Sequence, residues 1–445
     1  MTTYDVVGVG IGPFNLSLAA LADNVDDVSA LFFDAKPAFS WHPGMLIEGT
    51  ALQVPFLADL VTLVDPTSRW SFLSYLREHD RLFPFYFAER FHVPRREYDH
   101  YCRWVASSLP SCRFASPVQR VDRDGDMFAV RYVDQATGRH ETVAARNVVL
   151  GIGTVPSTPA AFDDVLGKRV FHSADYLDRV ASLHDARDVT VIGSGQSGAE
   201  VFLDLLHRQP DTGYRLRWLT RSAAFAPMEY SKLGLEHFTP DYTRYFRALP
   251  EPTRDALVPA QWQLYKAISA ETIAEIHDTL YERGIGGARP DVTMTPGIAV
   301  TAARQAAGGV ELGCRHTEQA RDFTLSTDRV VAATGYASRL PDCLDPVAGL
   351  VDWDDRGRYR VGADYRVALD AGAGLYVQNA ESHSHGVGAP DLGLGAHRAA
   401  VILNSITGDS TYRLPERCAF TDFGAFTDFG AVTTAAPHDT HPGGD

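Results

Sequence analysis

Two stretches of the chain repeat the same order of apolar runs, glycine turns and helical spacing. The run Asp5–Gly8 leads through a glycine turn and a helix-like stretch into a second apolar run, Val28–Phe33. The run Val189–Ile192 leads in the same way into a helix expected over Ala199–His207 and a strand expected over Leu216–Leu219. Short apolar runs that alternate with helices are typical of buried parallel strands in βαβ units. The pattern therefore predicts an α/β chain with two Rossmann-like dinucleotide-binding cores.

Two later apolar runs predict how the first core is completed. The run Val330–Ala333 ends in a Thr-Gly-Tyr turn, and Gly374–Val377 precedes a helix expected over Ala396–Asn404. We expect both runs to return to the first core, so that the second core is inserted in the first. Residues 240–283 carry apolar positions at helical spacing and predict a layer of helices on the substrate side.

This pattern divides the chain into two interleaved cores and a tail. The expected bounds are 1–165 and 330–410 for the first core, 166–329 for the second, and about 226–290 for the helical substrate-side segment within it. The end of the chain repeats Thr-Asp-Phe-Gly-Ala at 421–425 and 427–431 and then becomes rich in Pro, His, Gly and Asp. We predict a flexible tail over 411–445.

The first glycine turn has the features of a dinucleotide-binding motif. It stands between a strand and a helix and runs Gly8-Val9-Gly10-Ile11-Gly12-Pro13. Small residues let the backbone approach a pyrophosphate, and the start of the helix offers unpaired N–H groups. Pro13 replaces the usual last glycine. Asp34 stands roughly 20 positions further on, where an acid accepts a hydrogen bond from a ribose hydroxyl, so we expect an adenine dinucleotide here.

The second glycine turn matches the Gly-x-Gly-x-x-Gly pattern in full and runs Gly193-Ser194-Gly195-Gln196-Ser197-Gly198. The strand after it ends at Thr220-Arg221-Ser222 instead of at an acid. An arginine at that place favours a 2′-phosphate, so the sequence predicts NADPH. Two such cores, one inserted in the other, are typical of flavoproteins in which a nicotinamide reduces a flavin.

Composition limits where the electrons go next. The five cysteines include no Cys-x-x-Cys pair and the sequence has no metal-ligand cluster, which leaves oxygen as the expected acceptor. The formal net charge of −15 argues against nucleic acid as a partner and favours cationic substrates. The chain starts without a basic, apolar leader and has no run of about 18 apolar residues. We expect a cytoplasmic protein that does not enter a membrane.

Several local motifs resemble those of the siderophore-pathway N-hydroxylating flavin monooxygenases, which act on lysine, ornithine and aliphatic diamines. The likeness runs from about residue 4 to residue 407. The motifs are Gly8–Asn15, Phe39–Met45, Leu52–Leu57, Gly195–Ser197, Phe238–Pro240, Ala333–Tyr336 and Ser384–Gly386. In that family NADPH reduces FAD, oxygen adds at flavin C4a, and the amine attacks the resulting C4a-hydroperoxyflavin. The resemblance therefore implies N-hydroxylation with FAD and NADPH.

The resemblance also implies roles for single residues. In the family the residues that match Trp41 and Gln53 lie against the flavin or its adduct, and the loop Met45–Gln53 helps to enclose the flavin ring. His42 and His385 are candidates for a catalytic base, because histidine titrates near neutrality, although each could equally hold a loop by hydrogen bonds. The expected cofactor-binding residues are Gly8, Gly10, Gly12, Pro13, Asn15, Asp34, Trp41, His42, Gln53, Gly193, Gly195, Gln196, Ser197, Gly198, Arg221, Thr334, Gly335, Tyr336 and Leu392.

Three departures from the family pattern concern the substrate. Relatives that take lysine or ornithine carry a lysine where this chain has Ala58, a polar residue where it has Leu235, and a serine where it has Gly393. In those relatives the polar groups contact the carboxylate and head group of an amino acid. A buried carboxylate without a cationic partner costs several kcal/mol, so these departures favour a diamine, cadaverine or putrescine.

Four carboxylates are candidates to hold the distal ammonium of a diamine, namely Glu48, Asp59, Glu229 and Asp391. Asp59 and Asp391 could instead cap or brace local backbone. The amine that reacts must be uncharged. A free alkyl ammonium has a pKa near ~10.4, so the site has to depress that pKa or accept a proton from the amine.

Other interpretations of the same residues remain. A lysine N6-monooxygenase with a rearranged carboxylate site could use Arg69 or Lys232. A Baeyer–Villiger enzyme shares the scaffold, but residues 171–176 lack the motif associated with those enzymes. A catalytically silent flavin-binding protein is the last alternative, and the two intact glycine turns argue against it. The resemblance further implies a homo-oligomer, either a dimer or a tetramer.

Overall fold

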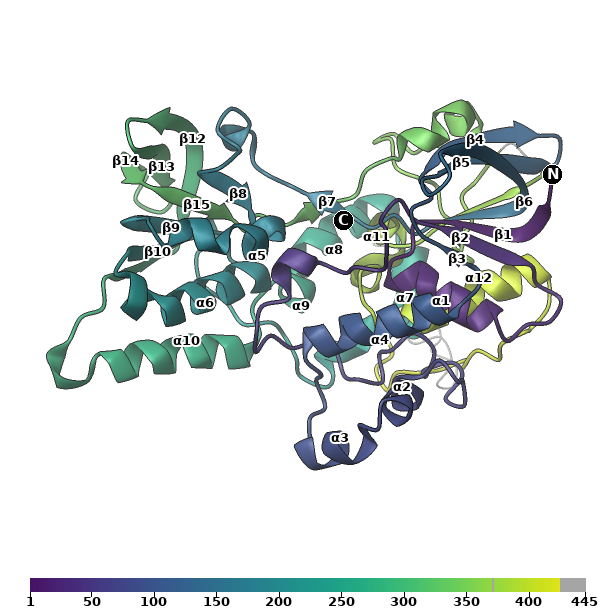
Figure 1. Cartoon of the computed structure of the whole chain (residues 1–445), viewed down its shortest axis with the longest axis horizontal. Coiled ribbons are helices and arrows are strands. Elements are labelled where there is room, and N and C mark those ends of the chain that lie inside the picture. Colours follow the sequence, from purple (N-terminus) through teal and green to yellow (C-terminus); the bar gives the residue numbers. More distant parts are fainter. Residues whose placement is uncertain (370–371, 425–445) are drawn as a thin grey trace, which may run out of the picture.

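The computed structural model describes residues 1–369 and 372–424, which form two lobes (Figure 1). The first lobe is built on a seven-stranded sheet in the order β3-β2-β1-β6-β5-β4, with β17 also paired to β6. Its strands are β1 (Thr3–Val9), β2 (Ala30–Phe33), β3 (Cys112–Arg113), β4 (Val118–Asp124), β5 (Met127–Asp134), β6 (Arg139–Leu150) and β17 (Gly374–Val377). β1 pairs in parallel with β2 and with β6, so the carboxyl ends of these strands meet at one edge.

Helices cover one face of the first sheet, and irregular segments cover the other. Every residue of α1 is buried, because this helix is apolar or small on all sides and packs against α12. The 3-10 helix η7 packs against β4 on the opposite face. The elements of this lobe are α1 (Pro13–Ala22), η1 (Pro43–Met45), α2 (Phe72–Glu78), α3 (Leu82–Ala88), α4 (Arg95–Ser108), η7 (Asp342–Leu350), α11 (Ser382–His385), η8 (Gly386–Gly388) and α12 (Gly395–Thr407).

The second lobe has the same three-layer order. Its parallel five-stranded sheet runs β11-β10-β9-β15-β8, with α6 and α10 on one face and a three-stranded antiparallel sheet on the other (Figure 1). The strands are β8 (Val170–His172), β9 (Asp188–Ile192), β10 (Arg215–Leu219), β11 (Val292–Thr295), β12 (Ile298–Ala306), β13 (Gly309–His316), β14 (Arg321–Thr327) and β15 (Arg329–Ala332). The helices are η3 (Ser173–Asp175), α5 (Tyr176–Arg179), η4 (Val180–Leu183), α6 (Gln196–Thr212) and α10 (Ala270–Arg283).

One strand lies in a different sheet from the one that the sequence predicted. We expected Val330–Ala333 to complete the first core, and only the later run, β17, does so. β15 instead pairs in parallel with β9 and with β8, inside the second sheet. An apolar run indicates that a strand is buried but not which sheet buries it. The second lobe therefore extends a few residues beyond the expected boundary at 329.

Two of the chain's crossings between the lobes lie side by side. β7 (Val155–Pro156) leads into the second lobe, and β16 (Tyr336–Ala337) returns from it. The two pair antiparallel as a two-stranded ribbon. The short 3-10 turn η2 (Ala160–Phe162) follows the first crossing.

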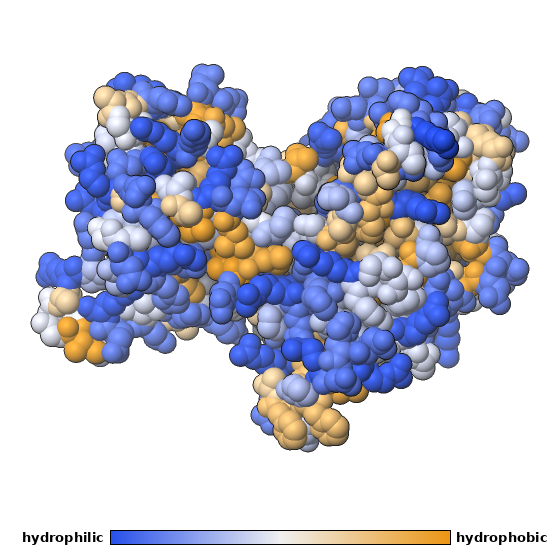
Figure 2. All heavy atoms as spheres, in the orientation of Figure 1, coloured by the Kyte–Doolittle hydropathy of each residue, from blue (hydrophilic) through white to orange (hydrophobic). Residues whose placement is uncertain are grey.

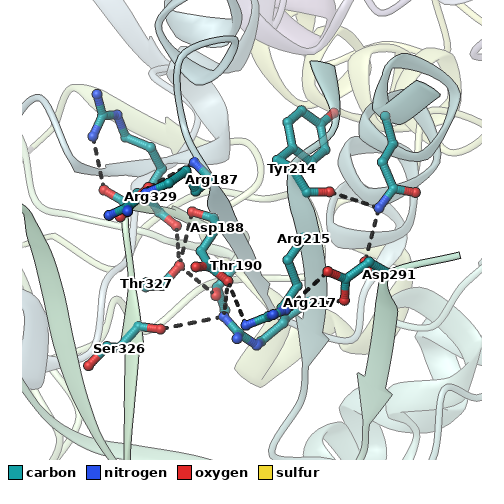
Figure 3. A network of polar contacts seen from close by, with 12 residues as sticks. Arg187, Asp188, Thr190, Tyr214, Arg215, Arg217, Asp291, Ser326, Thr327 and Arg329 are labelled. Carbon is teal, nitrogen blue, oxygen red and sulfur yellow. Dashed lines mark hydrogen bonds and ion pairs between the residues drawn. The ribbon is translucent and has the colours of Figure 1, made fainter. Parts of the chain in front are cut away.

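A polar network ties together the starts of the strands in the second sheet (Figure 3). Asp188 at the start of β9 forms ion pairs with Arg215 and Arg217 of β10, and Arg215 also reaches Asp291 before β11. The hydroxyl of Thr190 donates to that of Thr327, at 2.9 Å, deeper in the sheet. These contacts lie at the edge opposite the glycine turn, so they hold the strands in register without entering the site.

The segment 226–290 is largely helical, as predicted, but it does not form one layer. η5 (Gly234–Phe238), α7 (Pro240–Ala248) and α8 (Glu251–Ala260) pack against α11 and η8 of the first lobe, and α9 (Trp262–Tyr265) follows them. α10 packs on α6 instead and belongs to the second lobe. The segment ends with the 3-10 turn η6 (Ile285–Gly287).

The predicted flexible tail is wrong for its first part. Residues 411–424 pack on the body of the protein, where the hydroxyl of Tyr412 donates to the carbonyl of Leu21 at 2.8 Å. The remainder of the predicted tail, 425–445, lies outside the described residues. Within the part of the chain that the structure describes, no helix is long and apolar enough to cross a bilayer.

Candidate active site

One large cavity lies between the lobes, and it collects most of the residues singled out in the sequence. Both glycine turns line it, as do the loop from Ser40 to Ala58, the Thr334–Tyr336 turn and the Asp391–Gly393 segment. Figure 2 shows the surface hollowed between the two lobes. The carboxyl ends of parallel strands in both sheets point into this space, which is where open α/β sheets bind their ligands.

The first glycine turn is closed against the neighbouring strand. Gly10 has a φ of +87°, and a Cβ there would lie 2.6 Å from the carbonyl oxygen of Gly151, just after β6. α1 begins at Pro13, whose missing N–H costs no hydrogen bond at that position. Asp34 accepts from the amide of Ile11 at 2.8 Å, which fixes the turn. A carboxylate has about four acceptor sites, so Asp34 can also accept from a ribose.

The second glycine turn repeats this construction. Gly193 has a φ of +136°, and a Cβ there would lie 2.0 Å from the carbonyl oxygen of Ala333, just after β15. The indole of Trp218 donates to the carbonyl of Gly193 at 2.7 Å. Ser194 and Ser222 join their hydroxyls at 2.9 Å across the mouth of the turn.

Arg221 lies beside this turn and lines the cavity with an exposed side chain. Among residues 1–369 and 372–424 it has no hydrogen bond or ion pair, so its guanidinium is free for an anionic ligand. Its place directly after β10 is where a 2′-phosphate of a dinucleotide would lie.

Three residues expected to bind cofactor do not line the cavity. Gly8 leaves room for the ring of Phe32, because a Cβ there would lie 2.1 Å from that ring. Asn15 donates to the carbonyls of Gly10 and Val149, at 2.8 and 3.2 Å, and so braces the turn from behind. Gly198 lets α6 approach the preceding turn, because a Cβ on this glycine would lie 2.6 Å from the carbonyl oxygen of Gly193. These residues shape the turns without facing the ligand.

The loop that carries Trp41, His42 and Gln53 spans both lobes. Trp41 packs edge-on against Tyr98 of α4, with ring centroids 5.3 Å apart. Further along, Met45 and Ile47 belong to the hydrophobic core of the second lobe. The side-chain amide nitrogen of Gln53 is buried without a hydrogen-bond partner among the described residues, and it lines the cavity. A buried donor needs a partner, and a bound flavin would supply one.

The Thr334–Tyr336 turn and Leu392 complete the wall on the first-lobe side. Thr334 donates its hydroxyl to the carbonyl of Ser157 at 2.6 Å, which links the two crossings. The ring of Tyr336 contacts those of His42 and His172 edge-on, and its hydroxyl is buried without a partner in the described part of the chain. The cavity therefore offers a second orphaned polar group to a bound cofactor, and its residues fit one.

The two histidines proposed as bases lie in different places. His42 lines the cavity in a left-handed conformation (φ 47°), and the surrounding protein together with Arg95 and Lys36 lowers its pKa to about 4. His385 does not line the cavity. It stacks on Tyr365, and burial together with Arg247 holds its pKa well below the usual range. Both rings are therefore neutral at neutral pH.

An ion pair that the sequence did not reveal joins the lobes at the cavity wall. Arg95 at the start of α4 donates to Glu200 of α6 at 2.7 Å, and their side chains are 15% and 3% exposed. Gln196 of the second glycine turn also donates to Glu200, at 2.9 Å, and accepts from the amide of Ser269 at 2.8 Å. A single arginine and a single glutamate carry no spacing signal, so sequence alone could not pair them.

Three of the residues expected at the substrate, Ala58, Asp391 and Gly393, lie together in one corner of the cavity. Leu235 lines the same cavity. A Cβ on Gly393 would lie 2.8 Å from a carboxylate oxygen of Asp391 and 3.9 Å from the Cβ of Ala58. Burial raises the pKa of Asp391 to about 6, although the amides of Leu394 and Gly393 and the charge of Arg398 oppose it. This corner carries one carboxylate among small and apolar neighbours.

The other three candidate carboxylates are placed differently. Asp59 accepts from the amides of Val61, Thr62 and Phe72, at 2.9, 2.6 and 2.7 Å, and does not line the cavity. Glu229 is exposed, outside the cavity lining, and accepts from the amide of Ser231. Glu48 lines the cavity with an 88% exposed side chain. Asp59 thus braces backbone, and the two glutamates face solvent.

Neither cation of the alternative carboxylate site lies in this corner. Arg69 pairs with Asp23 on the surface of the first lobe. Lys232 is exposed, and like Arg69 it is absent from the residues that line the cavity.

Two glycine turns that face one cavity, one followed by an acid and the other by an unpaired arginine, define an oxidoreductase that uses two dinucleotides. The chain matches the family described as L-lysine 6-monooxygenase/L-ornithine 5-monooxygenase over residues 2–338. It belongs to this family and is a flavin-dependent N-hydroxylating monooxygenase.

Relatives and solved structures extend the likeness over nearly the whole chain. The rhizobactin siderophore biosynthesis protein RhbE of Rhizobium meliloti (strain 1021) is 46% identical, with 95% of this chain and 96% of that protein covered. A putrescine N-hydroxylase of Acinetobacter baumannii is 38% identical, with 98% of each chain covered. The FAD-bound structure of DfoA, a cadaverine monooxygenase of desferrioxamine biosynthesis from Erwinia amylovora, superposes with a TM-score of 0.93 at 38% identity and covers 96% of this chain and 100% of its own.

Proposed function

We propose that this enzyme uses FAD, NADPH and O2 to hydroxylate the terminal nitrogen of a small aliphatic diamine in hydroxamate siderophore biosynthesis. The observation that carries the proposal is the corner formed by Asp391, Ala58 and Gly393, in a cavity that Leu235 also lines. Its carboxylate lies among small and apolar side chains, and the nearby Arg398 is already paired with the buried Glu381, so the corner suits a second ammonium and not the carboxylate of an amino acid. Relatives named for putrescine and cadaverine support this assignment.

The two cofactors would occupy the two glycine turns. FAD would lie on Gly10, Gly12 and Asp34 of the first lobe, and NADPH would lie on the second turn with Arg221 and Ser222 at its 2′-phosphate. A bound FAD would supply the redox chemistry, which is acceptance of a hydride from NADPH and activation of O2, with one oxygen atom passing to the amine and the other leaving as water. Gln53 would donate from its unpartnered amide and orient the flavin ring.

Asp391 would give the two nitrogen atoms of a diamine different roles. The distal nitrogen, with an unperturbed pKa near ~10.4, stays an ammonium and pairs with the carboxylate, whereas the reacting nitrogen must be neutral. His42, with a pKa of about 4, is neutral at the working pH. It can accept a hydrogen bond from the reacting amine but cannot retain its proton, so the proton leaves to water or cofactor.

The direct test is hydroxylamine formation by the FAD-loaded protein with NADPH and O2, with cadaverine, putrescine, lysine and ornithine compared side by side. Product from a diamine with little from lysine supports the proposal. A preference for lysine would overturn the diamine assignment and leave N-hydroxylation standing. NADPH oxidation without any hydroxylamine from the four amines would contradict the wider proposal.

The exposed aromatic side chains of α3 support a homo-oligomer. Phe83, Tyr86 and Phe87 are 76%, 72% and 73% exposed, and Figure 2 shows an apolar projection at the bottom of the molecule, where Figure 1 places α3. Three aromatic side chains of ~200 Å² each, about three-quarters exposed, would bury roughly 900 Å² between two copies, so neighbouring residues would complete an interface of the usual size. We propose that α3 contacts a second copy. Sedimentation should show a smaller species for Phe83→Ser but not for Tyr281→Ser, and unchanged size for both would contradict the contact.

We further propose that the enzyme works in the cytoplasm. The described cysteines Cys102, Cys112, Cys314, Cys343 and Cys418 are all unpaired, as expected for a chain kept in a reducing compartment. Labelling of the thiols in protein taken directly from cells would test this, because a disulfide found there would contradict it.

A further inference from the structure

The end of the described chain crosses the outer side of the substrate-side helices. We call residues 416–424 the C-terminal strap. It begins where Arg244 of α7 donates to the carbonyl of Glu416 at 2.6 Å, and continues where the amide of Cys418 donates to Asp241 at 2.6 Å. These two contacts fasten the strap to α7 before it reaches η5.

Beyond α7 the strap holds two neighbouring residues of η5. Glu236 accepts from the amides of Phe420 and Thr421, at 3.0 and 2.8 Å. The ring of Phe423 lies 5.3 Å from that of His237 and 5.0 Å from that of Tyr242. The Thr421 side chain, together with the two backbone amides, lowers the pKa of Glu236, so this carboxylate is ionised and its bonds to the strap are charge-assisted.

The other side of η5 faces the cavity. In a 3-10 helix, residues three positions apart lie on the same face, and Leu235 and Phe238 form such a pair. Both line the cavity, whereas the strap holds the two residues between them. η5 has no buried residue of its own; it lies against α7 and η8, and the strap covers the side that faces away from the cavity.

The segment before η5 gives it little support. Ser231, Lys232 and Leu233 are exposed, and the last of them is 66% exposed. The nearest anchor toward the N-terminus is Tyr230, whose hydroxyl donates to the backbone carbonyl of Gln53 at 3.2 Å. The wall that carries Leu235 is therefore held at one end by Tyr230 and at the other by α7 and the strap.

We propose that the C-terminal strap sets the amine specificity of the enzyme by holding Leu235 and Phe238 against the substrate. Glu236 and Phe423 are positioning residues that act through η5. This inference rests on the proposed function, because it assigns the wall of the same site. A fixed wall excludes longer or bulkier amines and keeps the reacting nitrogen at the flavin, so a loosened wall weakens amine binding and blunts the choice between amines.

The test compares Phe423→Ala and Glu236→Gln with Phe420→Ala in the full-length, FAD-loaded enzyme. Phe420 lies on the same strap, its side chain is 91% exposed, and only its backbone contacts Glu236, so it is the matched control. We expect Phe423→Ala to raise KM for the preferred amine about tenfold, to raise KM for NADPH less than twofold, and to reduce the preference between cadaverine and putrescine. Glu236→Gln should act in the same direction and more weakly, because glutamine keeps one acceptor oxygen.

Hydrogen exchange supplies a readout that does not depend on the substrate. The amides of residues 229–238 should exchange faster in Phe423→Ala and Glu236→Gln than in the wild type, and at the wild-type rate in Phe420→Ala. Faster exchange with an unchanged amine KM and an unchanged preference would overturn the role in specificity. Unchanged exchange would show that the strap does not hold η5 at all. If the wild type prefers lysine, the proposed substrate is wrong, and the strap is still tested on KM for lysine.

Discussion

The two glycine turns share their backbone construction and differ at one charged position. Gly10 closes against the carbonyl of Gly151 and Gly193 against that of Ala333, and each contacted residue follows the neighbouring parallel strand. The first charged residue after the next strand is acidic in the first lobe and basic in the second, with Asp34 directly after β2 and Arg221 two positions after β10. The comparison teaches that chain geometry determines where a pyrophosphate can lie, whereas one side chain determines which ribose is accepted.

Substitution of the two turn glycines should separate the lobes by function. Gly10→Ala combines a positive φ with a Cβ 2.6 Å from a carbonyl, and we expect it to weaken FAD binding by about 4 kcal/mol, roughly 1,000-fold. Gly193→Ala should weaken NADPH binding comparably and leave flavin content unchanged. Flavin absorbance of the purified proteins and titration with NADPH measure both. Loss of flavin from Gly193→Ala would show that the turns are not independent.

Removal of Arg95 should loosen the junction between the two lobes. Arg95→Ala leaves the carboxylate of Glu200 buried without its partner, and we expect a loss of about 3 kcal/mol in the free energy of unfolding. We take the lower end of the usual range because Arg95 is partly exposed. Arg96→Ala is the matched control, since its partner Glu48 is 4.0 Å away and exposed, and it should change stability by less than about 0.5 kcal/mol. Urea unfolding of both variants measures this difference in stability, and equal unfolding midpoints would contradict the prediction.

Substitution of Arg221 should show whether this side chain selects the nucleotide at the second turn. Arg221→Ala should raise KM for NADPH about 10- to 50-fold and change KM for NADH little, because only NADPH carries the 2′-phosphate. Arg217→Ala serves as control, because Arg217 lies in β10 just before Arg221 and pairs with Asp188 away from the cavity. Equal effects of Arg221→Ala on both nucleotides would exclude a phosphate contact.

The amine site, which neither turn supplies, should respond to pH in its own way. Asp391 has a pKa raised to about 6, so it is ionised above this pH and becomes protonated as the pH falls through it. KM for a diamine should therefore rise up to about tenfold below pH 6, whereas KM for NADPH should not follow. Asp391→Asn should raise KM at neutral pH and flatten the profile. A profile that persists in Asp391→Asn would assign the titration to another group.

Sequence reasoning predicted the parts of the molecule that local pattern determines. Both glycine turns, Asp34 and Arg221 follow from strand, turn and helix order, and all of the residues expected to face the cofactors are found at or directly behind the cavity wall. The pattern could not assign β15 to its sheet, because burial alone does not identify the partner strands. It could not separate Asp391 from Asp59, since only the surrounding hydrogen bonds show which carboxylate is already satisfied.

The pairing of Arg95 with Glu200 and the packing of the C-terminal strap were also beyond sequence reasoning. Both depend on contacts between residues more than one hundred positions apart, and neither has a local spacing that marks it. The polar, glycine-containing composition of residues 416–424 resembles that of a tail, and only Phe423 contributes an aromatic ring to the hydrophobic cluster around Tyr242 and Phe246.

The passage of one loop through both lobes limits how this enzyme can be recombined. Gly44 approaches the carbonyl of Ala174 so closely that a Cβ would lie 1.9 Å from it, and Met45 and Ile47 fill the core of the second lobe. A chimera that exchanges the nicotinamide lobe as a cassette would leave these side chains facing a foreign core. The exchangeable unit is therefore the inserted lobe together with residues 43–47, and a library built on the lobe boundary alone would yield mostly misassembled proteins.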